Sequence, residues 1–172
     1  MKLLIVVDMQ NDFIDGALGT AEAVAIVGRV KAKMDAYRSA GDDIIFTRDT
    51  HQENYLETTE GKHLPVVHCV EGSWGWQVRE ELEDEKLPHI NKPNFGWTGW
   101  KNMGLEKYES VELVGLCTDI CVVSNALILK AAYPDLPITV DASCCAGVTP
   151  ATHTAALATM KMCQVNVIDE CA

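Results

Sequence analysis

Lys2-Leu-Leu-Ile-Val-Val-Asp8 holds five consecutive apolar residues between a lysine and an aspartate. A short continuous apolar run that stops at a polar residue is typical of a strand buried on both faces. Strands of this kind belong to sheets that helices cover on both sides. The run therefore predicts the first strand of an α/β domain.

Helical and extended patterns alternate along the rest of the chain. Residues 21–40 carry apolar side chains at helical spacing and stop before Gly41, a residue type that commonly ends helices. We predict further strands over residues 43–47, 87–91, 110–116, 138–141 and 164–168, and further helices over residues 74–87, 118–132 and 149–162. Such alternation gives a parallel sheet between two helical layers. The prediction is a single α/β domain, residues 1–172, of three-layer αβα architecture with a central, mostly parallel six-stranded sheet.

The composition suits a folded domain and argues against two kinds of partner. Of the 172 residues, 48% are hydrophobic and 23% charged, so a sizeable core can form. The 25 acidic residues outnumber the 14 basic ones, and no Lys/Arg cluster stands out, which argues against nucleic acid. No apolar stretch approaches the roughly 20 residues of a spanning helix, so no membrane partner is expected.

Seven cysteines, an odd number, occur without an export signal. This pattern predicts reduced thiols and a cytoplasmic location. No Cys-x-x-Cys pair occurs, which disfavours a structural zinc site of the finger type.

Reactive side chains follow several predicted strands at the point where each strand ends. They are Asp8, Asp49, His51, Lys92, Cys117 and Cys121. In open α/β sheets, ligands bind outside the carboxyl ends of the strands. An acid, an imidazole, a cation and a thiol at one edge therefore predict an active site there.

The thiol of Cys121 is the candidate nucleophile. It lies in the first turn after a strand, where helix amides and a nearby cation stabilise a thiolate. The same amides can form an oxyanion hole for acyl transfer. Two alternatives stay open, because most free cysteines are small buried hydrophobes and Cys117, four residues earlier, is a second candidate.

Asp8 and Lys92 each have a structural and a catalytic interpretation. Asp8 either caps a turn or acts as a general base that takes the thiol proton and later returns it to a leaving amine. Lys92 is an ordinary surface lysine unless it lies near both Asp8 and Cys121. There its charge would favour the thiolate and the carboxylate together.

Asp49 and His51 form an Asp-x-His pair that can bind one cation, because side chains two residues apart in an extended segment point the same way. His68 and either Glu60 or His63 can complete the ligand set. These residues fall in a segment without periodicity, residues 51–73, that is longer than compact domains usually tolerate without a function.

Aromatic residues concentrate near Lys92. Phe95 and Trp97 are candidates for the wall of an apolar pocket that accepts a flat substrate.

Five segments resemble the isochorismatase-like cysteine hydrolases, and nicotinamidases most closely, in order over nearly the whole chain. They are Val6-Val-Asp-Met-Gln-Asn-Asp-Phe13, Arg48-Asp-Thr-His51, Leu64-Pro-Val-Val-His-Cys-Val-Glu-Gly72, Lys92 and Gly115-Leu-Cys-Thr-Asp-Ile-Cys-Val122. The resemblance implies a triad of Asp8, Lys92 and Cys121, in which the thiol attacks an amide carbonyl, ammonia leaves and water hydrolyses the thioester. It also implies a cis peptide bond between Leu116 and Cys117, with oxyanion contacts from the amides of Cys117 and Cys121.

The resemblance further implies a divalent metal bound by Asp49, His51, His68 and a fourth residue, for which Glu60 is favoured over His63. Zinc is the favoured ion, with manganese or iron as alternatives. In that arrangement the metal would bind the pyridine nitrogen of nicotinamide, and Gln10 and Phe13 would line the pocket. Family members commonly form homo-oligomers, so a homo-oligomer is expected.

The leading hypothesis is a metal-assisted cysteine amidohydrolase that converts nicotinamide, or a similar small amide, to the acid and ammonia. One alternative is the same triad acting on another small amide or carbamoyl compound. A second is a non-enzymatic thiol switch or binding protein that uses Cys117 and Cys121.

Overall fold

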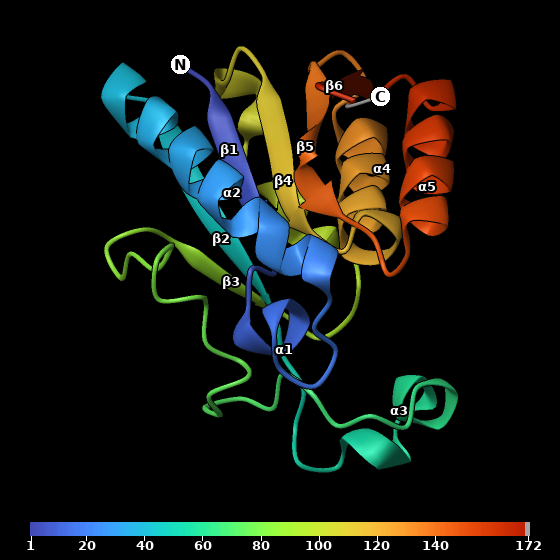
Figure 1. Cartoon of the computed structure of the whole chain (residues 1–172). Helices are drawn as coiled ribbons and strands as arrows, with labels where there is room; N and C mark the ends of the chain where they lie inside the picture. The colour runs from blue at the N-terminus through green and yellow to red at the C-terminus, as the bar shows by residue number, and fades with distance from the viewer. Residues whose placement is uncertain (171–172) are drawn as a thin grey trace.

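A parallel sheet forms the centre of the computed structural model, which describes residues 1–170 (Figure 1). Cys171 and Ala172 lie outside the described residues. The strands are β1 (Leu3–Val7), β2 (Asp43–Asp49), β3 (His89–Lys92), β4 (Val111–Leu116), β5 (Ile138–Ala146) and β6 (Asn166–Ile168). Within the described residues these six strands lie in the order β3-β2-β1-β4-β5-β6, and every neighbouring pair is parallel. The predicted six-stranded α/β fold is confirmed.

Helices cover both faces of this sheet. The helices on the two faces are α2 (Ala21–Ala40), α4 (Val123–Ala132) and α5 (Pro150–Met162). The short helices α1 (Asn11–Ile14) and α3 (Thr59–His63) lie beyond the carboxyl ends of the strands (Figure 1). Leu4 and Val6 of β1 pack in the core that α2 covers, whereas Leu3, Ile5 and Val7 pack in the core that α4 and α5 cover. The continuous apolar run of β1 is thus buried from both sides, as its sequence predicts.

Side-chain caps fix the ends of the two longest helices. Thr20 accepts a hydrogen bond from the Ala23 amide at the start of α2, and Gly41 ends that helix with a left-handed φ of 72°. Thr149 and Thr152 form a reciprocal capping box at the start of α5, with Pro150 in its first turn. The helices predicted over residues 21–40 and 149–162 are confirmed by these boundaries.

The helix predicted over residues 74–87 is wrong. This segment consists of turns, and its Val78 and Leu82 pack in the core beside α2. Part of its backbone bonds to the chain after β1: Arg79 N–H donates to the Met9 carbonyl, and Asn11 N–H donates to the Gln77 carbonyl. Clustered like charges also disfavour a helix here, because acidic residues fill most of positions 80–85.

Smaller differences concern element ends next to the site. The strands β2 and β5 run to Asp49 and Ala146, beyond their predicted ends, and β3 begins two residues later than predicted, at His89. The helix predicted over residues 118–132 begins with a π-helical turn, Thr118–Val122, and continues as α4. Cys121 therefore lies in a widened turn, a feature often found at functional sites.

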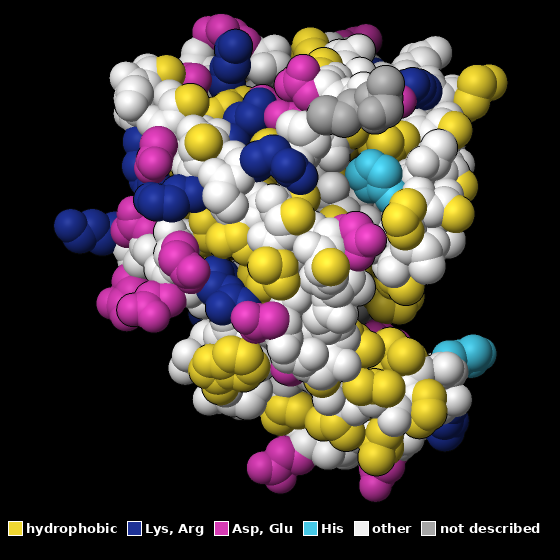
Figure 2. Space-filling view, in the orientation of Figure 1, with side chains coloured by type: hydrophobic (Ala, Val, Ile, Leu, Met, Phe, Trp, Pro, Cys, Tyr) yellow, Lys and Arg dark blue, Asp and Glu magenta, His cyan; other side chains and the backbone are white. Residues whose placement is uncertain are grey.

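The strand order places a topological switch point between β1 and β4. From β1 the chain moves outward to β2 and β3, then returns to the other side of β1 with β4. The segment of residues 51–73, here called the α3 lobe, lies beyond the carboxyl ends of the strands (Figure 1). Hydrophobic side chains gather on the surface of this end of the molecule (Figure 2), and Leu56, Leu64 and Val67 are among the exposed ones.

Among the helices of residues 1–170, none combines the length and the apolar character that crossing a membrane requires.

Candidate active site

Asp8, Lys92 and Cys121 meet at the carboxyl ends of β1, β3 and β4. The Lys92 ammonium lies 2.6 Å from Asp8 Oδ2 and 3.5 Å from Cys121 Sγ, and all three residues are almost completely buried. Of the two interpretations of Lys92, the structure places it near both of the others and not on the surface. Asp8 has a left-handed φ of 47°, a backbone conformation that non-glycine residues adopt rarely and mainly at functional sites.

Further polar groups hold these side chains in place. Thr47 donates a 2.6 Å hydrogen bond to Asp8 Oδ1, and the Lys92 ammonium also donates to the Asn94 carbonyl at 3.2 Å. Thr47 escaped the sequence analysis, although it pairs in register with Val7, directly before Asp8. Pairing two predicted parallel strands by their ends would have pointed to it.

Lys92 carries positive charge into an acidic environment. Burial opposes that charge, but the carboxylates of Asp8 and Asp49 outweigh burial and hold the pKa of Lys92 above its usual value. Burial raises the pKa of Asp8 above its ordinary value, since it outweighs the attraction of Lys92. The ammonium thus remains charged and is shared between two carboxylates.

The Cys121 thiol is protonated at rest. Burial raises the pKa of Cys121 well above its usual value, and the negative charge of Asp8 raises it further, while Lys92 acts in the opposite direction. A thiol in this state needs a base in contact with it before it can act as a nucleophile. Asp8 is the carboxylate proposed for this part, because Lys92 contacts both Asp8 and Cys121.

Cys117 lies at the end of β4, and the peptide bond between Leu116 and Cys117 is cis, as the resemblance implies. Cys117 and Cys121 border the same cavity. Burial raises the pKa of the Cys117 thiol to about 12. Because Lys92 lies beside Cys121, Cys121 is better placed than Cys117 to act as the nucleophile.

Asp49, His51, Glu60 and His68 form a second cluster beside the first. One donor atom from each lies within 4.8 Å of the donor atoms of the other three. Asp49 belongs to both clusters, because its Oδ2 lies 2.9 Å from His51 Nε2 while its Oδ1 lies 3.4 Å from the Lys92 ammonium. Burial would raise the pKa of Asp49, but hydrogen bonds with the two histidines and the charge of Lys92 hold it well below its usual value.

The donor chemistry of this cluster fits a divalent cation. Two imidazole nitrogens and two carboxylates are a ligand set that zinc and similar ions accept. His68 Nδ1 donates to the Val66 carbonyl at 2.7 Å, so its Nε2 faces the cluster and lies 3.8 Å from Glu60 Oε1. Such a backbone bond is the usual support of a metal-binding histidine.

The structure separates the two candidates for the fourth ligand. Glu60 Oε1 lies 3.4 Å from His51 Nε2 and within the cluster. The His63 ring is exposed, and its Nδ1 donates to the Thr59 carbonyl within α3. Glu60, the residue favoured from the sequence, is therefore the one brought to the other three.

A cavity of about 330 Å³ opens onto both clusters. Its apolar wall contains Phe13, Leu18, Ala23, Leu64, Phe95, Leu116, Ile120 and Val148. Asp49, Glu60, His68, Cys117 and Cys121 also line it. The predicted positions of Phe13 and Phe95 in the pocket agree with this wall.

Gln10 and Trp97 do not line this cavity, contrary to the expectation from the sequence. The Trp97 ring packs edge-on against Trp100, at 4.9 Å between ring centroids, in the core beneath α4. The Gln10 side chain is fully buried and bonds to both backbone groups of Asp49, donating to its carbonyl at 2.8 Å and accepting from its amide at 2.7 Å. Gln10 thus holds Asp49, a residue of the second cluster, in place instead of forming the pocket wall.

The geometry can be compared with known proteins. A family model for the isochorismatase domain matches residues 2–170. The chain belongs to this family.

Its relatives include amide-hydrolysing enzymes. The nicotinamidase of Saccharomyces cerevisiae is 27% identical, over 74% of this chain and 80% of that relative. The nicotinamidase/pyrazinamidase of Mycobacterium tuberculosis is 24% identical over 98% of both chains. The pyrazinamidase of Pyrococcus horikoshii, solved in complex with zinc, is 26% identical over 98% of both chains, with a TM-score of 0.84. The predicted resemblance to nicotinamidase-like isochorismatase-family hydrolases is confirmed.

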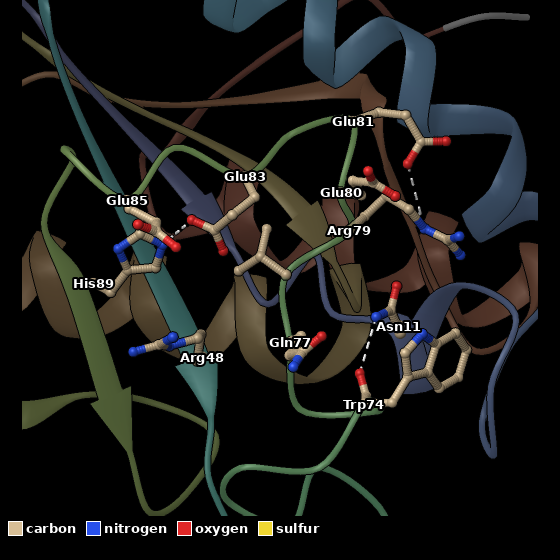
Figure 3. Close-up of a pocket in the computed structure, with 11 residues that line it drawn as sticks. Asn11, Arg48, Trp74, Gln77, Arg79, Glu80, Glu81, Glu83, Glu85 and His89 are labelled. Carbon is tan, nitrogen blue, oxygen red and sulfur yellow. Dashed lines mark hydrogen bonds and ion pairs between the residues drawn. The ribbon is translucent and has the colours of Figure 1, made fainter.

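A larger hollow lies elsewhere, between the start of β3 and the irregular segment of residues 74–87 (Figure 3). Its volume is about 770 Å³, and four glutamates line it. His89 faces it but pairs with Glu83 at 2.8 Å, and Arg79 lies 4.0 Å from Glu81. Neither cysteines nor members of the two clusters are among the described residues that line it, so size alone does not mark the reactive site.

Proposed function

We propose that the protein is a cysteine amidohydrolase that converts nicotinamide to nicotinate and ammonia. One observation carries the proposal: Lys92 joins Asp8 and Cys121 beside a cavity that Asp49, Glu60 and His68 of the ligand cluster also line. A nucleophile with its base, and a ligand cluster on the same cavity, suit an amide whose ring carries a second donor atom.

In the first half-reaction, Asp8 takes the proton from the Cys121 thiol, and Sγ attacks the amide carbonyl carbon. The N–H groups of Cys117 and Cys121 stabilise the negative charge that develops on the carbonyl oxygen. Asp8 then returns the proton to the amide nitrogen, the C–N bond breaks and ammonia leaves. The product is a thioester on Cys121.

In the second half-reaction, water attacks the thioester carbonyl and Asp8 accepts one of its protons. The C–S bond breaks, the acid leaves and the Cys121 thiol regains a proton. Lys92 stays charged throughout, so it holds Asp8 in place and limits the cost of ionising it while the proton moves.

The cluster of Asp49, His51, Glu60 and His68 is proposed to hold a divalent ion, with zinc favoured and manganese or iron as alternatives. When bound, such an ion supplies an electron-pair acceptor for the pyridine nitrogen. Phe13 and Phe95, which line the cavity, would then confine the flat ring of the substrate.

The cavity favours a neutral aromatic amide over a carbamoyl compound that carries a carboxylate. Neither lysine nor arginine is among the described residues that line it, whereas Asp49 and Glu60 are both acidic. Away from the ligand cluster, a carboxylate entering this space would find apolar walls without a cationic side chain among the described lining residues, and burying it unpaired is costly. This observation favours nicotinamide over the carbamoyl alternative.

Ammonia release from the purified protein tests the proposal. We expect steady turnover of nicotinamide and none of an N-carbamoyl amino acid at the same concentration. Turnover of the N-carbamoyl amino acid without turnover of nicotinamide would favour the carbamoyl alternative instead. Release from neither compound would refute amide hydrolysis of either kind.

We also propose that the protein forms a homo-oligomer. The exposed Leu56, Leu64 and Val67 on the α3 lobe support this proposal, because apolar side chains gathered at one end of a molecule commonly mark contact surfaces. Light scattering on the purified protein tests it directly, and a monomeric mass at micromolar concentration would contradict it.

A further inference from the structure

Asn125 of α4 uses all of its hydrogen-bonding capacity inside the protein. Its amide nitrogen donates to the Cys121 carbonyl at 2.8 Å and to the Phe95 carbonyl at 3.1 Å. Its amide oxygen accepts from the Trp97 amide at 3.0 Å and from the Trp100 indole at 2.8 Å. A fully buried amide with two bonds donated and two accepted is completely satisfied.

These bonds join two parts of the site that are far apart in sequence. One part is the π-helical turn that carries Cys121. The other is the segment of residues 94–97, here called the strap, whose Phe95 forms part of the cavity wall. The strap is also held at its start by Lys92, whose ammonium donates to the Asn94 carbonyl.

The strap lies directly against α4. At Gly96, an added Cβ atom would collide with Ile128 and contact Ser124, so the backbone approaches the helix as closely as glycine allows. Phe95 is 43% exposed, so few contacts other than the backbone bonds to Asn125 fix its position. The place of the wall relative to the thiol therefore depends mainly on the bonds of Asn125, while Lys92 holds the start of the strap.

We propose that Asn125 is a positioning residue that sets the distance between the substrate wall at Phe95 and the nucleophile at Cys121. It touches neither the substrate nor the reacting atoms. This inference rests on the proposed function for its kinetic consequence, but its structural consequence can be measured without any substrate.

The test compares Asn125→Ser with Ser124→Ala. A serine hydroxyl can donate to the carbonyl four residues earlier, which preserves the bond to Cys121 and releases the strap. Ser124 lies next to Asn125 on the same helix, and no side-chain hydrogen bond to it is found within the described residues, so Ser124→Ala is the matched control.

For Asn125→Ser we expect KM for nicotinamide to rise about fivefold to tenfold with kcat within about twofold, because the strap bonds act on binding and the triad stays intact. Hydrogen exchange at the Trp97 amide should accelerate at least about tenfold. Ser124→Ala should match the wild type in both measurements.

Either of two results overturns the proposal. One is an unchanged KM together with an unchanged Trp97 exchange rate. The other is a lower melting temperature with kcat reduced at constant KM, which is the signature of a purely structural role. If the wild type releases no ammonia from nicotinamide, the proposed function fails by itself. Trp97 exchange and the rate of Cys121 alkylation by iodoacetamide, which should both rise in Asn125→Ser, then decide the positioning role.

Discussion

Lys92 is the side chain on which the charges of the site depend. It lies between the carboxylates of Asp8 and Asp49 with no exposed surface of its own. We expect Lys92→Met to lower the free energy of unfolding by about 3 to 5 kcal/mol, because two buried carboxylates lose their partner. Urea denaturation measures this loss. The exposed Lys62→Met is the control and should change stability by less than about 0.5 kcal/mol, and equal effects would contradict the account.

The fourth metal ligand can be tested with two residues of the same short helix. Glu60→Ala removes a carboxylate from the cluster, whereas His63→Ala removes an exposed ring bonded to its own helix. We expect the first change to weaken zinc binding at least about tenfold and the second to leave it unaltered. Isothermal titration with zinc on the chelator-treated variants gives both affinities. Weaker binding in His63→Ala alone would reverse the assignment.

At the scale of elements, β4 depends on a glycine. Gly115 has φ of +120°, and a Cβ atom there would overlap the Val7 carbonyl oxygen of β1. We expect Gly115→Ala to destabilise the fold by more than about 1 kcal/mol, since both conformation and space exclude the methyl group. In α2, nothing approaches the site of a Cβ at Gly28, so Gly28→Ala should stabilise the protein by about 0.5 to 1 kcal/mol. Chemical denaturation of both variants checks that the two substitutions change the free energy of unfolding in opposite directions.

The elements also show what could be predicted from the sequence. Continuous apolar runs and helical spacing suffice for β1 and α2, because burial there follows one pattern along one element. The prediction of a helix over residues 74–87 fails because part of this segment bonds to the backbone of Met9 and Asn11, which no local pattern reveals.

The same distinction between local patterns and long-range packing applies to the candidate site. The convergence of Asp8, Lys92 and Cys121 could be predicted, since parallel strands end at one edge of a sheet. The bonds of Gln10 to Asp49 and the packing of Trp97 against Trp100 could not be predicted, because both depend on which side of a loop packs against another element. The choice between Glu60 and His63 likewise depends on how α3 is oriented.

At the scale of the whole molecule, the ligand cluster links stability to pH. Burial would lower the pKa of His51, but its hydrogen bonds and charge interactions with Asp49 and Glu60 outweigh burial and raise the pKa to about 9 from its usual 6.5. In protein stripped of metal, the stabilisation that His51 gains from this proton is complete below about pH 6.5 and is lost as the pH rises to about 9.

We therefore expect the denaturation midpoint of the chelator-treated protein to fall between pH 6.5 and pH 9. His51→Gln, treated in the same way, should show a smaller fall, and the difference isolates this histidine from other titrating groups. Zinc at 100 times its dissociation constant should add about 2.7 kcal/mol to the stability of the wild type. A flat pH profile for the stripped wild type would contradict the charge state of the cluster.

The central claim is that Cys121 is the nucleophile of an amide hydrolase. The most direct test measures ammonia release from nicotinamide by Cys121→Ala and Cys117→Ala beside the wild type, with circular dichroism confirming that each is folded. We expect Cys121→Ala to lose at least about 10³-fold in kcat, because it lacks the nucleophilic thiol. Cys117→Ala should retain most of its turnover, because only the backbone amide of that residue takes part. Turnover that survives in Cys121→Ala, or that disappears only in Cys117→Ala, would contradict the account.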